Sequence, residues 1–433
     1  MIIILLISII VMMFIYTLKR EYLSPSFLVA LSFAFASIGC IMFKKEWELN
    51  FSNKMILLIC LGIICCYIGE MSIYFLTRKS KNTIKLYINI KPIIIENYKL
   101  IIFIFLQLIT LVLYYHEVKS IAGSSESFSI MMSKYKDAIY MNTSLEGNVN
   151  ILVKQFAKIS YIGTMIFIFV FLNNTISKSK IKNNIKYLIP SIIFIGQAVI
   201  SSSRSLILQI AVAGIVYYYI LHQMESNWTK KLDYKAIQKI ILFALMILLS
   251  FWGIKEIVGR LTHNKSFIEY ITYYFSGGMA FFQKYIENPF GNFENVIGAE
   301  TFPGILGFLS KFISDLNIVG NLEFRYSGSI HGNTYTAFRS YYHDFGILGV
   351  ILLEGIFAIV YSVWINKIKV ITINRKKNYQ RSIIIFGCFA YPLVYEPIAA
   401  QLYRTVLSVN GLTYLVIIYG LYWFLFKLRL KLR

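Results

Sequence analysis

Long apolar runs recur along almost the whole chain and constrain its fold more than any other feature of the sequence. Each run has about 17–22 residues, and a helix needs about 20 apolar residues to cross the hydrocarbon core of a bilayer. We therefore predict one all-α integral membrane domain, 1–433, built as a polytopic bundle of about eleven transmembrane helices. The predicted spans are 2–18, 25–43, 55–76, 99–115, 151–172, 187–202, 205–222, 239–257, 344–366, 382–399 and 406–426.

Composition narrows the class of protein. Hydrophobic residues make up 57% of the chain and charged residues only 15%, which excludes a disordered chain and argues against a soluble domain. The formal net charge of +22 would suggest a nucleic-acid partner in a soluble protein. Here the basic residues lie in short loops between apolar runs, so membrane orientation explains the charge and we expect no nucleic-acid partner.

The distribution of lysine and arginine predicts how the chain is oriented in the membrane. More than half of the 43 basic residues fall in one set of alternating loops, at 19–24, 77–99, 173–186, 222–239, 367–381 and 427–433. Cytoplasmic loops carry such an excess of basic residues. We therefore predict that this set of loops and the C-terminus lie in the cytoplasm, and that the N-terminus lies outside.

Two long loops are predicted to face outside, at about 116–150 and about 258–343. A loop as long as 258–343 is usually functional or forms structure of its own. Its stretches FIEYITYYFSGGMAFFQKYI and FPGILGFLSKFISDL are apolar and aromatic with scattered charges, a pattern typical of short helices in the membrane interface. The alternative is that they form the packed interior of a small lid, and the two interpretations are compatible.

The sequence carries none of the common motifs for nucleotide binding or hydrolysis. It has no P-loop, no GxGxxG, no HExxH and no GxSxG. The aspartates are far apart, so no DxD pair can hold a metal ion with a nucleotide-sugar; they are Asp137, Asp233, Asp315 and Asp344. We therefore predict no metal site and no cofactor.

Five arginines lie in segments that are predicted to face outside, namely Arg204, Arg260, Arg325, Arg339 and Arg404. An arginine at a membrane edge is costly unless it is paired, and its guanidinium suits bidentate binding of phosphate. Each arginine is therefore either a ligand for a diphosphate group or a structural anchor or ion-pair partner. Arg204 is flanked by serines in SSSRS at a span junction, and Arg404 has Glu396 as its expected structural partner.

The stretch HGNTYTAFRSYYHDFG, residues 331–346, crowds polar side chains against the start of a predicted span. Histidine is the commonest general base near neutral pH, so His331 and His343 are both catalytic candidates. Asp344 is either a third catalytic candidate or the N-cap of the helix that follows.

Two carboxylates are predicted to lie at membrane depth. Glu70 and Glu354 each fall inside an apolar span, and an ionisable group there is a functional hypothesis by default. For Glu70 the alternative is a structural role beside Arg78. For Glu354 we expect a position on the wall of a cavity.

Three stretches resemble the bacterial O-antigen and capsular oligosaccharide repeat-unit polymerases (Wzy-type). SSSRSLILQIAVAGIVYYY is similar to a junction of small residues and arginine that leads into a span. YYFSGGMAFFQKYIENPFGNFENVIGAETFPGILGFL is similar to the long outer loop of that family. HGNTYTAFRSYYHDFGILG is similar to its N-x-Y-T … Y-x-D-F-G-x-x-G ending, and the likeness in pattern covers about residues 187–365.

The resemblance implies a GT-C-like membrane fold and an inverting, metal-independent glycosyl transfer on the outer leaflet of the bacterial cytoplasmic (inner) membrane. Donor and acceptor would both be undecaprenyl-diphosphate-linked oligosaccharides in O-antigen (lipopolysaccharide) or capsular polysaccharide synthesis. The base would be His331, His343 or Asp344. The five arginines would bind the diphosphate, and Asn333 and Tyr335 would bind the substrate. A flippase and a chain-length determinant are the partner proteins that the resemblance implies.

Two alternatives to a polymerase stay open at this point. The first is an O-antigen-type ligase, which would use a lipid A core or a protein as acceptor. The second is a lipid-linked-glycan flippase or another transporter. A transporter should show internal repeat symmetry and polar residues in many spans, whereas this chain has few polar residues in its spans and one large outer loop, which favours an enzyme.

Overall fold

Helices dominate the structure, a computed structural model of the chain. It describes residues 1–19, 21–77, 90–123, 127–140, 149–178, 181–203, 205–229, 232–257, 266–289, 296–313, 321–374 and 378–429. Within these ranges the strands form one short hairpin. The prediction of an all-α bundle is confirmed, and the apolar composition of its helices indicates a multi-pass membrane protein.

Nine helices in the described ranges are long and apolar enough to cross a membrane. They are α1 (Ile2–Lys19), α2 (Pro25–Met42), α3 (Asn53–Thr77), α4 (Asn97–Ala122), α6 (Ile151–Ile176), α9 (Ser205–Glu225), α10 (Tyr234–Ile257), α13 (Ala337–Ile373) and α16 (Val409–Tyr422), the last continued by η4 (Trp423–Lys427). Each lies over one of the predicted spans. Only α13 extends well beyond its predicted span at both ends.

Two predicted spans, 187–202 and 382–399, have no helix of spanning length. The 3₁₀ turn η2 (Ile185–Leu188) and the 12-residue α8 (Ile189–Ile200) share the first of them. In the second, α14 (Tyr379–Cys388) ends shortly before the proline that starts α15 (Pro392–Tyr395). Proline lacks an N–H group and disfavours helical geometry in the residue before it. An apolar run that contains proline is therefore a weaker signal for a continuous span than its length suggests.

The remaining elements lie in the connections between the long helices. They are α5 (Phe128–Tyr140), α7 (Ile181–Asn184), α11 (Phe267–Glu287), α12 (Pro303–Leu309), β1 (Arg325–Ser327), β2 (Ile330–Gly332) and η3 (Leu402–Val406). Helix α11 confirms that the first apolar stretch of the long outer loop is helical, whereas α12 covers only Pro303–Leu309 of the second. The hairpin between them and α13 is not anticipated by the sequence, because its strands have only three residues each.

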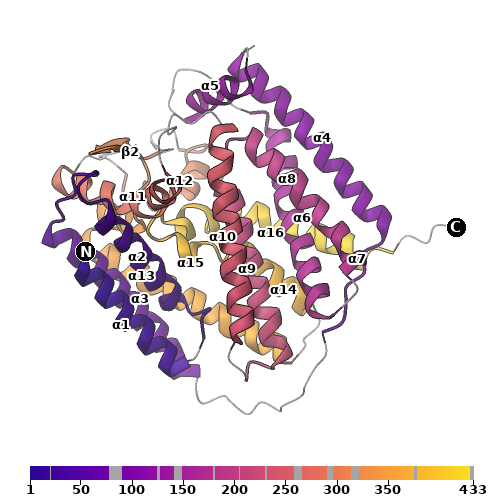
Figure 1. The fold of residues 1–433 in the computed structure, drawn as a ribbon, viewed down its shortest axis with the longest axis horizontal. Coiled ribbons are helices and arrows are strands. Elements are labelled where there is room, and N and C mark those ends of the chain that lie inside the picture. The colour runs from indigo at the N-terminus through magenta and orange to yellow at the C-terminus, as the bar shows by residue number, and fades with distance from the viewer. Residues whose placement is uncertain are drawn as a thin grey trace. The chain divides into compact units, whose positions relative to one another are not determined.

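The chain divides into two compact units. Unit 1 comprises Met1–Ile84, Ser266–Val370 and Tyr391–Leu412, and unit 2 comprises Lys85–Lys265, Ile371–Ala390 and Thr413–Arg433. In unit 1, α1, α2 and α3 pack against one another and α2 also packs against α11 (Figure 1). In unit 2, α4, α6 and α8 pack together, and α9 packs against α6, α10 and α14. Unit 1 contains the whole 331–346 stretch and the long outer loop from Ser266 onward.

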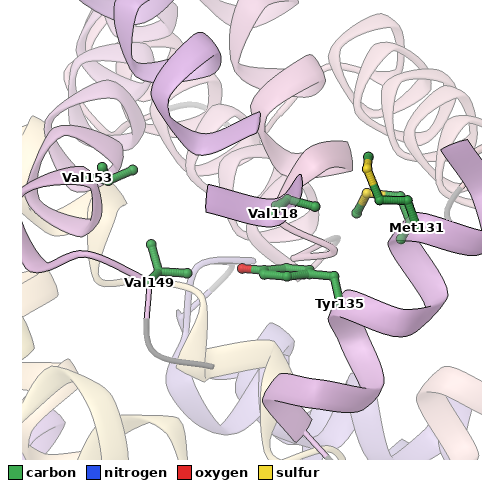
Figure 2. Close-up of a cluster of buried hydrophobic side chains, with 6 residues drawn as sticks. Val118, Met131, Tyr135, Val149 and Val153 are labelled. Atoms are coloured by element: carbon green, nitrogen blue, oxygen red, sulfur yellow. The ribbon is translucent and has the colours of Figure 1, made fainter. Parts of the chain in front are cut away.

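A buried cluster in unit 2 anchors the first long loop to the helices on either side of it. Its members come from α4, α5, the start of α6 and the segment just before it, namely Val118, Met131, Met132, Tyr135, Val149 and Val153. In Figure 2 the Tyr135 ring lies next to Val118, and its hydroxyl is on the side of Val149. The Tyr135 hydroxyl is 3.2 Å from that of Tyr114 on α4, so one polar contact completes the apolar packing.

Helix α13 changes direction at Gly346. The backbone there has φ 63° and ψ −153°, so the helical segment 337–345 and the long segment after it are separated by one non-helical residue. Glycine adopts a positive φ without the steric penalty of a side chain, which is why the sequence can place the break at this residue. The start of the first segment is fixed by the Ala337 N–H, which donates to the Glu396 carbonyl at 2.8 Å.

Candidate functional site

Arg339 is the centre of a buried ion-pair network in unit 1. It lies in the first turn of α13 and is completely buried. Its Nη2 donates to Glu300 Oε1 at 2.8 Å and to Glu323 Oε2 at 2.7 Å. The guanidinium carbon also lies 4.1 Å from the centre of the Tyr335 ring and 4.7 Å from that of Tyr285, distances typical of cation–π contacts. Arg339 thus joins α13, α11 and two segments of the outer loop.

Glu300 is the most strongly perturbed carboxylate of this network. The pKa of Glu300 is raised to about 8, mainly by burial; the charge of Arg339 opposes the rise, and the charges of Asp344 and Glu323 contribute to it. One carboxyl oxygen, Oε2, is buried without a hydrogen-bond partner in the described chain. A carboxyl group with a pKa near neutrality can exchange protons under physiological conditions. Glu300 is therefore a candidate proton-transfer group that the sequence prediction did not include.

His343 lies beside Glu300 and follows Arg339 by one turn in the first α13 segment. Its Nδ1 is 2.8 Å from the Tyr285 hydroxyl, and its Nε2 is 3.8 Å from Glu300 Oε1. Burial raises the pKa of Tyr285 to about 12, so this phenol keeps its proton near neutral pH. Because Tyr285 occupies Nδ1, Nε2 is the ring nitrogen that can exchange a proton with Glu300 or with a bound molecule.

Asp344 holds the turn that carries Glu300. Its Oδ2 accepts a hydrogen bond from the Thr301 N–H at 2.7 Å, and its Oδ1 accepts a longer one from the Glu300 N–H at 3.5 Å. The interpretation of Asp344 as a helix N-cap is wrong, because helical structure already begins at Ala337 and the Asp344 oxygens bind the 300–301 turn. This side chain positions Glu300. In the described ranges, no group of three or more His, Cys, Asp or Glu side chains could hold a metal ion.

His331 lies on the hairpin, away from any carboxylate partner in the described chain. Strand β1 pairs with β2 so that Tyr326 is opposite His331. The two rings stack with their centres 4.0 Å apart, and the centre of the Phe324 ring lies 5.1 Å from that of the imidazole ring. His331 is exposed and Tyr326 is 72% exposed. The three rings form an exposed aromatic surface, and none of the described groups activates His331 as a base.

The three described arginines of the predicted site differ in their partners. Arg339 has two carboxylates, as described above. Arg325 donates from Nε to Glu323 Oε1 at 3.1 Å and from Nη1 to the Lys284 carbonyl at 2.9 Å. Arg404, on η3, donates from Nη1 to the main-chain carbonyl of Glu300 at 2.9 Å. Of these three arginines, Arg404 is the one with which no described carboxylate forms a salt bridge, so among them its positive charge is the most open to an anionic ligand.

The other predicted site residues have varied positions. Tyr335 is buried beneath Arg339, and its hydroxyl donates to the Glu323 carbonyl at 3.0 Å. Asn333 is half-buried in the segment between β2 and α13. Arg204 and Arg260 lie outside the described residues. Glu300, Glu323 and Tyr285 were not among the predicted site residues, and all three come from the outer loop. A buried arginine such as Arg339 needs acidic partners close to it, and this requirement is the signal that pointed to the two glutamates.

Glu354 and Glu396 form a second acidic pair in unit 1. Both side chains are completely buried, and none of their four carboxyl oxygens has an oxygen or nitrogen hydrogen-bond partner in the described part of the chain. Glu354 lies beside the Cys66 thiol of α3, and the two carboxylates interact electrostatically. The interpretation of Glu396 as the partner of Arg404 is therefore wrong, because the Glu396 carboxyl has no such contact.

Glu70, by contrast, is fully paired. Its carboxylate forms an ion pair with Lys19 of α1 and accepts hydrogen bonds from Ser24 and from Ser26. The Ser26 N–H donates to Oε2 at 2.8 Å. Arg78, the partner considered from the sequence, lies outside the described residues. The contacts of Glu70 support a structural role that joins α1, the start of α2 and α3.

Comparison of the chain with protein-family models, with curated proteins and with solved structures finds no match.

Proposed function

We propose that the chain is a membrane glycosyltransferase, a polymerase of undecaprenyl-diphosphate-linked oligosaccharide repeat units of the O-antigen or capsule type. One observation carries the proposal. Arg404 is a guanidinium whose described acceptor is a main-chain carbonyl, and that carbonyl belongs to Glu300, which also contacts Arg339 and lies near His343. An arginine without a carboxylate partner suits a diphosphate leaving group, whose negative charge grows as its bond to the sugar breaks.

In the proposed reaction His343 acts as general base. Its Nε2 takes the proton of the acceptor hydroxyl in the tautomer whose Nδ1–H donates to the Tyr285 hydroxyl oxygen, and this hydrogen bond holds the ring in place. The acceptor oxygen forms a bond to the anomeric carbon of the donor sugar, and the bond from that carbon to the diphosphate oxygen breaks. The diphosphate leaves with the electron pair and is stabilised by Arg404. Glu300, whose Oε1 lies 3.8 Å from Nε2, then takes the proton from His343 in the fraction of molecules in which Glu300 is ionised, because its pKa is about 8.

The proposal assigns different roles to the predicted site residues. Arg339 and Asp344 become positioning residues, because each binds and orients Glu300 or its turn. The exposed rings of Tyr326 and His331 suit the apolar faces of sugars, so they are proposed to guide the glycan rather than to move protons. The GT-C-like class, a site on the outer leaflet of a bacterial cytoplasmic membrane, an N-terminus outside, and a flippase and chain-length determinant as partners are parts of the same proposal.

The decisive experiment supplies the full-length protein in lipid nanodiscs with lipid-diphosphate-linked repeat units. We expect a ladder of longer glycans without added nucleotide. Arg404→Gln and His343→Ala should each lower the rate of elongation by about 100-fold or more. The matched control is Arg325→Gln, because Arg325 is already paired with Glu323 and should matter less.

Other outcomes would replace the proposal. Transfer of a single glycan to a lipid A core or to a protein, with no ladder, would identify a ligase. Movement of the lipid-linked unit across a vesicle bilayer without elongation would identify a transporter. A normal ladder from Arg404→Gln would show that the diphosphate is bound elsewhere.

A further inference from the structure

An apolar cavity of about 320 Å³ lies inside unit 2. Residues of α6, α8, α9 and α10 line it, together with the last residue of η2. Most of these side chains are aliphatic or phenylalanine. The polar exceptions are Thr164, Ser191, Tyr218 and Lys239. The Thr164 hydroxyl already has a hydrogen-bond partner within α6, because it donates to the Ser160 carbonyl at 2.8 Å.

Helix α10 forms one wall of this cavity and is the most weakly packed of the nine apolar helices. Only 6% of its 18-residue apolar window is buried. Phe243, which lines the cavity, is itself 37% exposed, so the cavity opens at the side of α10. In a membrane that side faces hydrocarbon, and a space of this shape beside an under-packed helix is suited to a lipid chain.

Three of the four polar residues of the cavity lie at one end, namely Ser191, Tyr218 and Lys239. Helices α8, α9 and α10 follow one another through short connections, so α8 and α10 run in the same direction and α9 runs in the opposite one. Ser191 lies near the start of α8, Tyr218 near the end of α9 and Lys239 near the start of α10. All three therefore belong to the same end. The opposite end has apolar residues such as Ile207 and Ile247.

Two of these polar groups lack partners in the described chain. The Ser191 Oγ is buried and has no hydrogen-bond partner. Lys239 is exposed and forms no salt bridge with any described acid. The acid closest to it along the helix, Asp233, lies 3.7 Å from His222 instead. A buried polar atom without a partner is stabilised by a bound group that can form a hydrogen bond with it. A lysine without a salt bridge at the mouth of an apolar cavity attracts an anionic lipid headgroup.

We propose that this cavity binds one acyl chain of an anionic membrane phospholipid, with the phosphate on Lys239 and the glycerol ester region at Ser191. Along α10, Lys239, Phe243 and Ile247 are spaced four residues apart and all line the cavity. They form one stripe of about 12 Å that leads from the charged group into the apolar space. The site thus has the polarity of a lipid, with its charge at one end. The inference does not depend on the reaction proposed above.

The test measures which lipids stay bound to the full-length protein. The protein is reconstituted in vesicles of phosphatidylcholine mixed with phosphatidylglycerol, extracted, and analysed by native mass spectrometry. We expect phosphatidylglycerol to be retained in preference to phosphatidylcholine. Lys239→Gln should lower that preference by about fivefold, the contribution of one lysine near an anionic lipid. Lys235→Gln is the matched control, because Lys235 lies one turn earlier on α10 and does not line the cavity.

A second pair of variants tests the apolar part of the site. At Gly214, an added Cβ would lie 3.6 Å from Phe243 and 3.7 Å from Ile168, which is ordinary contact. Gly214→Ala should therefore retain lipid, whereas Gly214→Leu should extend into the cavity and reduce retention of both lipids. The Leu variant should also speed hydrogen exchange of the α10 amides if the lipid chain supports that helix. Equal retention of the two lipids by the unmodified protein, or equal losses from the Lys239 and Lys235 variants, would overturn the proposal.

Discussion

Replacement of Arg339 by glutamine should destabilise the protein strongly. The change leaves two carboxylates without the cation that now lies 2.8 and 2.7 Å from them, and Glu300 is only 1% exposed. Removing one member of a buried ion pair costs about 3–5 kcal/mol, mostly because the remaining charge is left unpaired in a site that water cannot reach. Arg404→Gln is the matched comparison. It removes a hydrogen bond to a carbonyl, so we expect a loss of about 1.5 kcal/mol.

The measurement is the midpoint of thermal unfolding of the detergent-solubilised protein, followed by circular dichroism at about pH 9, where Glu300 with its pKa of about 8 is ionised. Arg339→Gln should lower the midpoint by on the order of 10 °C, and Arg404→Gln by less than half as much. The double variant Arg339→Gln/Glu300→Gln should recover part of the loss, because it removes one of the stranded charges. If the Arg339 and Arg404 variants lose the same stability, or if the double variant is worse than the sum of the single ones, the ion-pair argument fails.

Three further predictions follow from the same unit. The folded-state pKa of Glu300 is raised from 4.5 to about 8, so between these pH values the folded protein holds a proton that the unfolded chain releases. This proton's contribution to the free energy of unfolding is full below about pH 4.5 and should be lost as the pH rises toward 8. In unfolding curves measured across this range, Glu300→Gln should flatten the decline of stability with pH. His343→Ala should abolish glycan elongation while His331→Ala leaves most of it, and the reverse result would move the base to the hairpin. Glu354→Gln and Glu396→Gln should each change the unfolding midpoint little, because neither carboxyl takes part in a described ion pair, and a loss comparable with that of Arg339→Gln would contradict this.

Apolar length was enough to predict most of the long helices, because each of them has a continuous apolar surface. The failures occurred where local backbone chemistry overrides apolarity. Pro190 and Pro392 start short helices inside runs that look long enough to span, and Gly346 divides a run that looks continuous. These residues can be read in the sequence, but a prediction from apolar length alone does not take their effect on the helix backbone into account.

The candidate site was predicted in part. The sequence places Arg339, His343 and Asp344 within one short stretch, and the structure brings them to one network. Their partners Glu300 and Glu323 lie far away along the chain, and only tertiary packing decides which carboxylate meets which guanidinium. For the same reason the sequence could not separate Arg404, which lacks a carboxylate partner in the described ranges, from arginines that are already neutralised.

The break at Gly346 has a consequence for how the protein responds to its membrane. A long apolar helix adjusts its tilt to the thickness of the bilayer. If α13 were one continuous helix, a change in its tilt would also move the residues at its N-terminal end. Here a single non-helical residue separates the long part of α13 from the short segment that carries Arg339 and His343. Alanine at Gly346 would meet no atom within 4 Å, so its effect would come from the backbone alone, at about 1–3 kcal/mol for a conformation that only glycine adopts readily. We expect Gly346→Ala to make activity depend on lipid chain length, measured in nanodiscs of short-chain and long-chain phosphatidylcholine, whereas the unmodified protein works equally well in thin and thick bilayers.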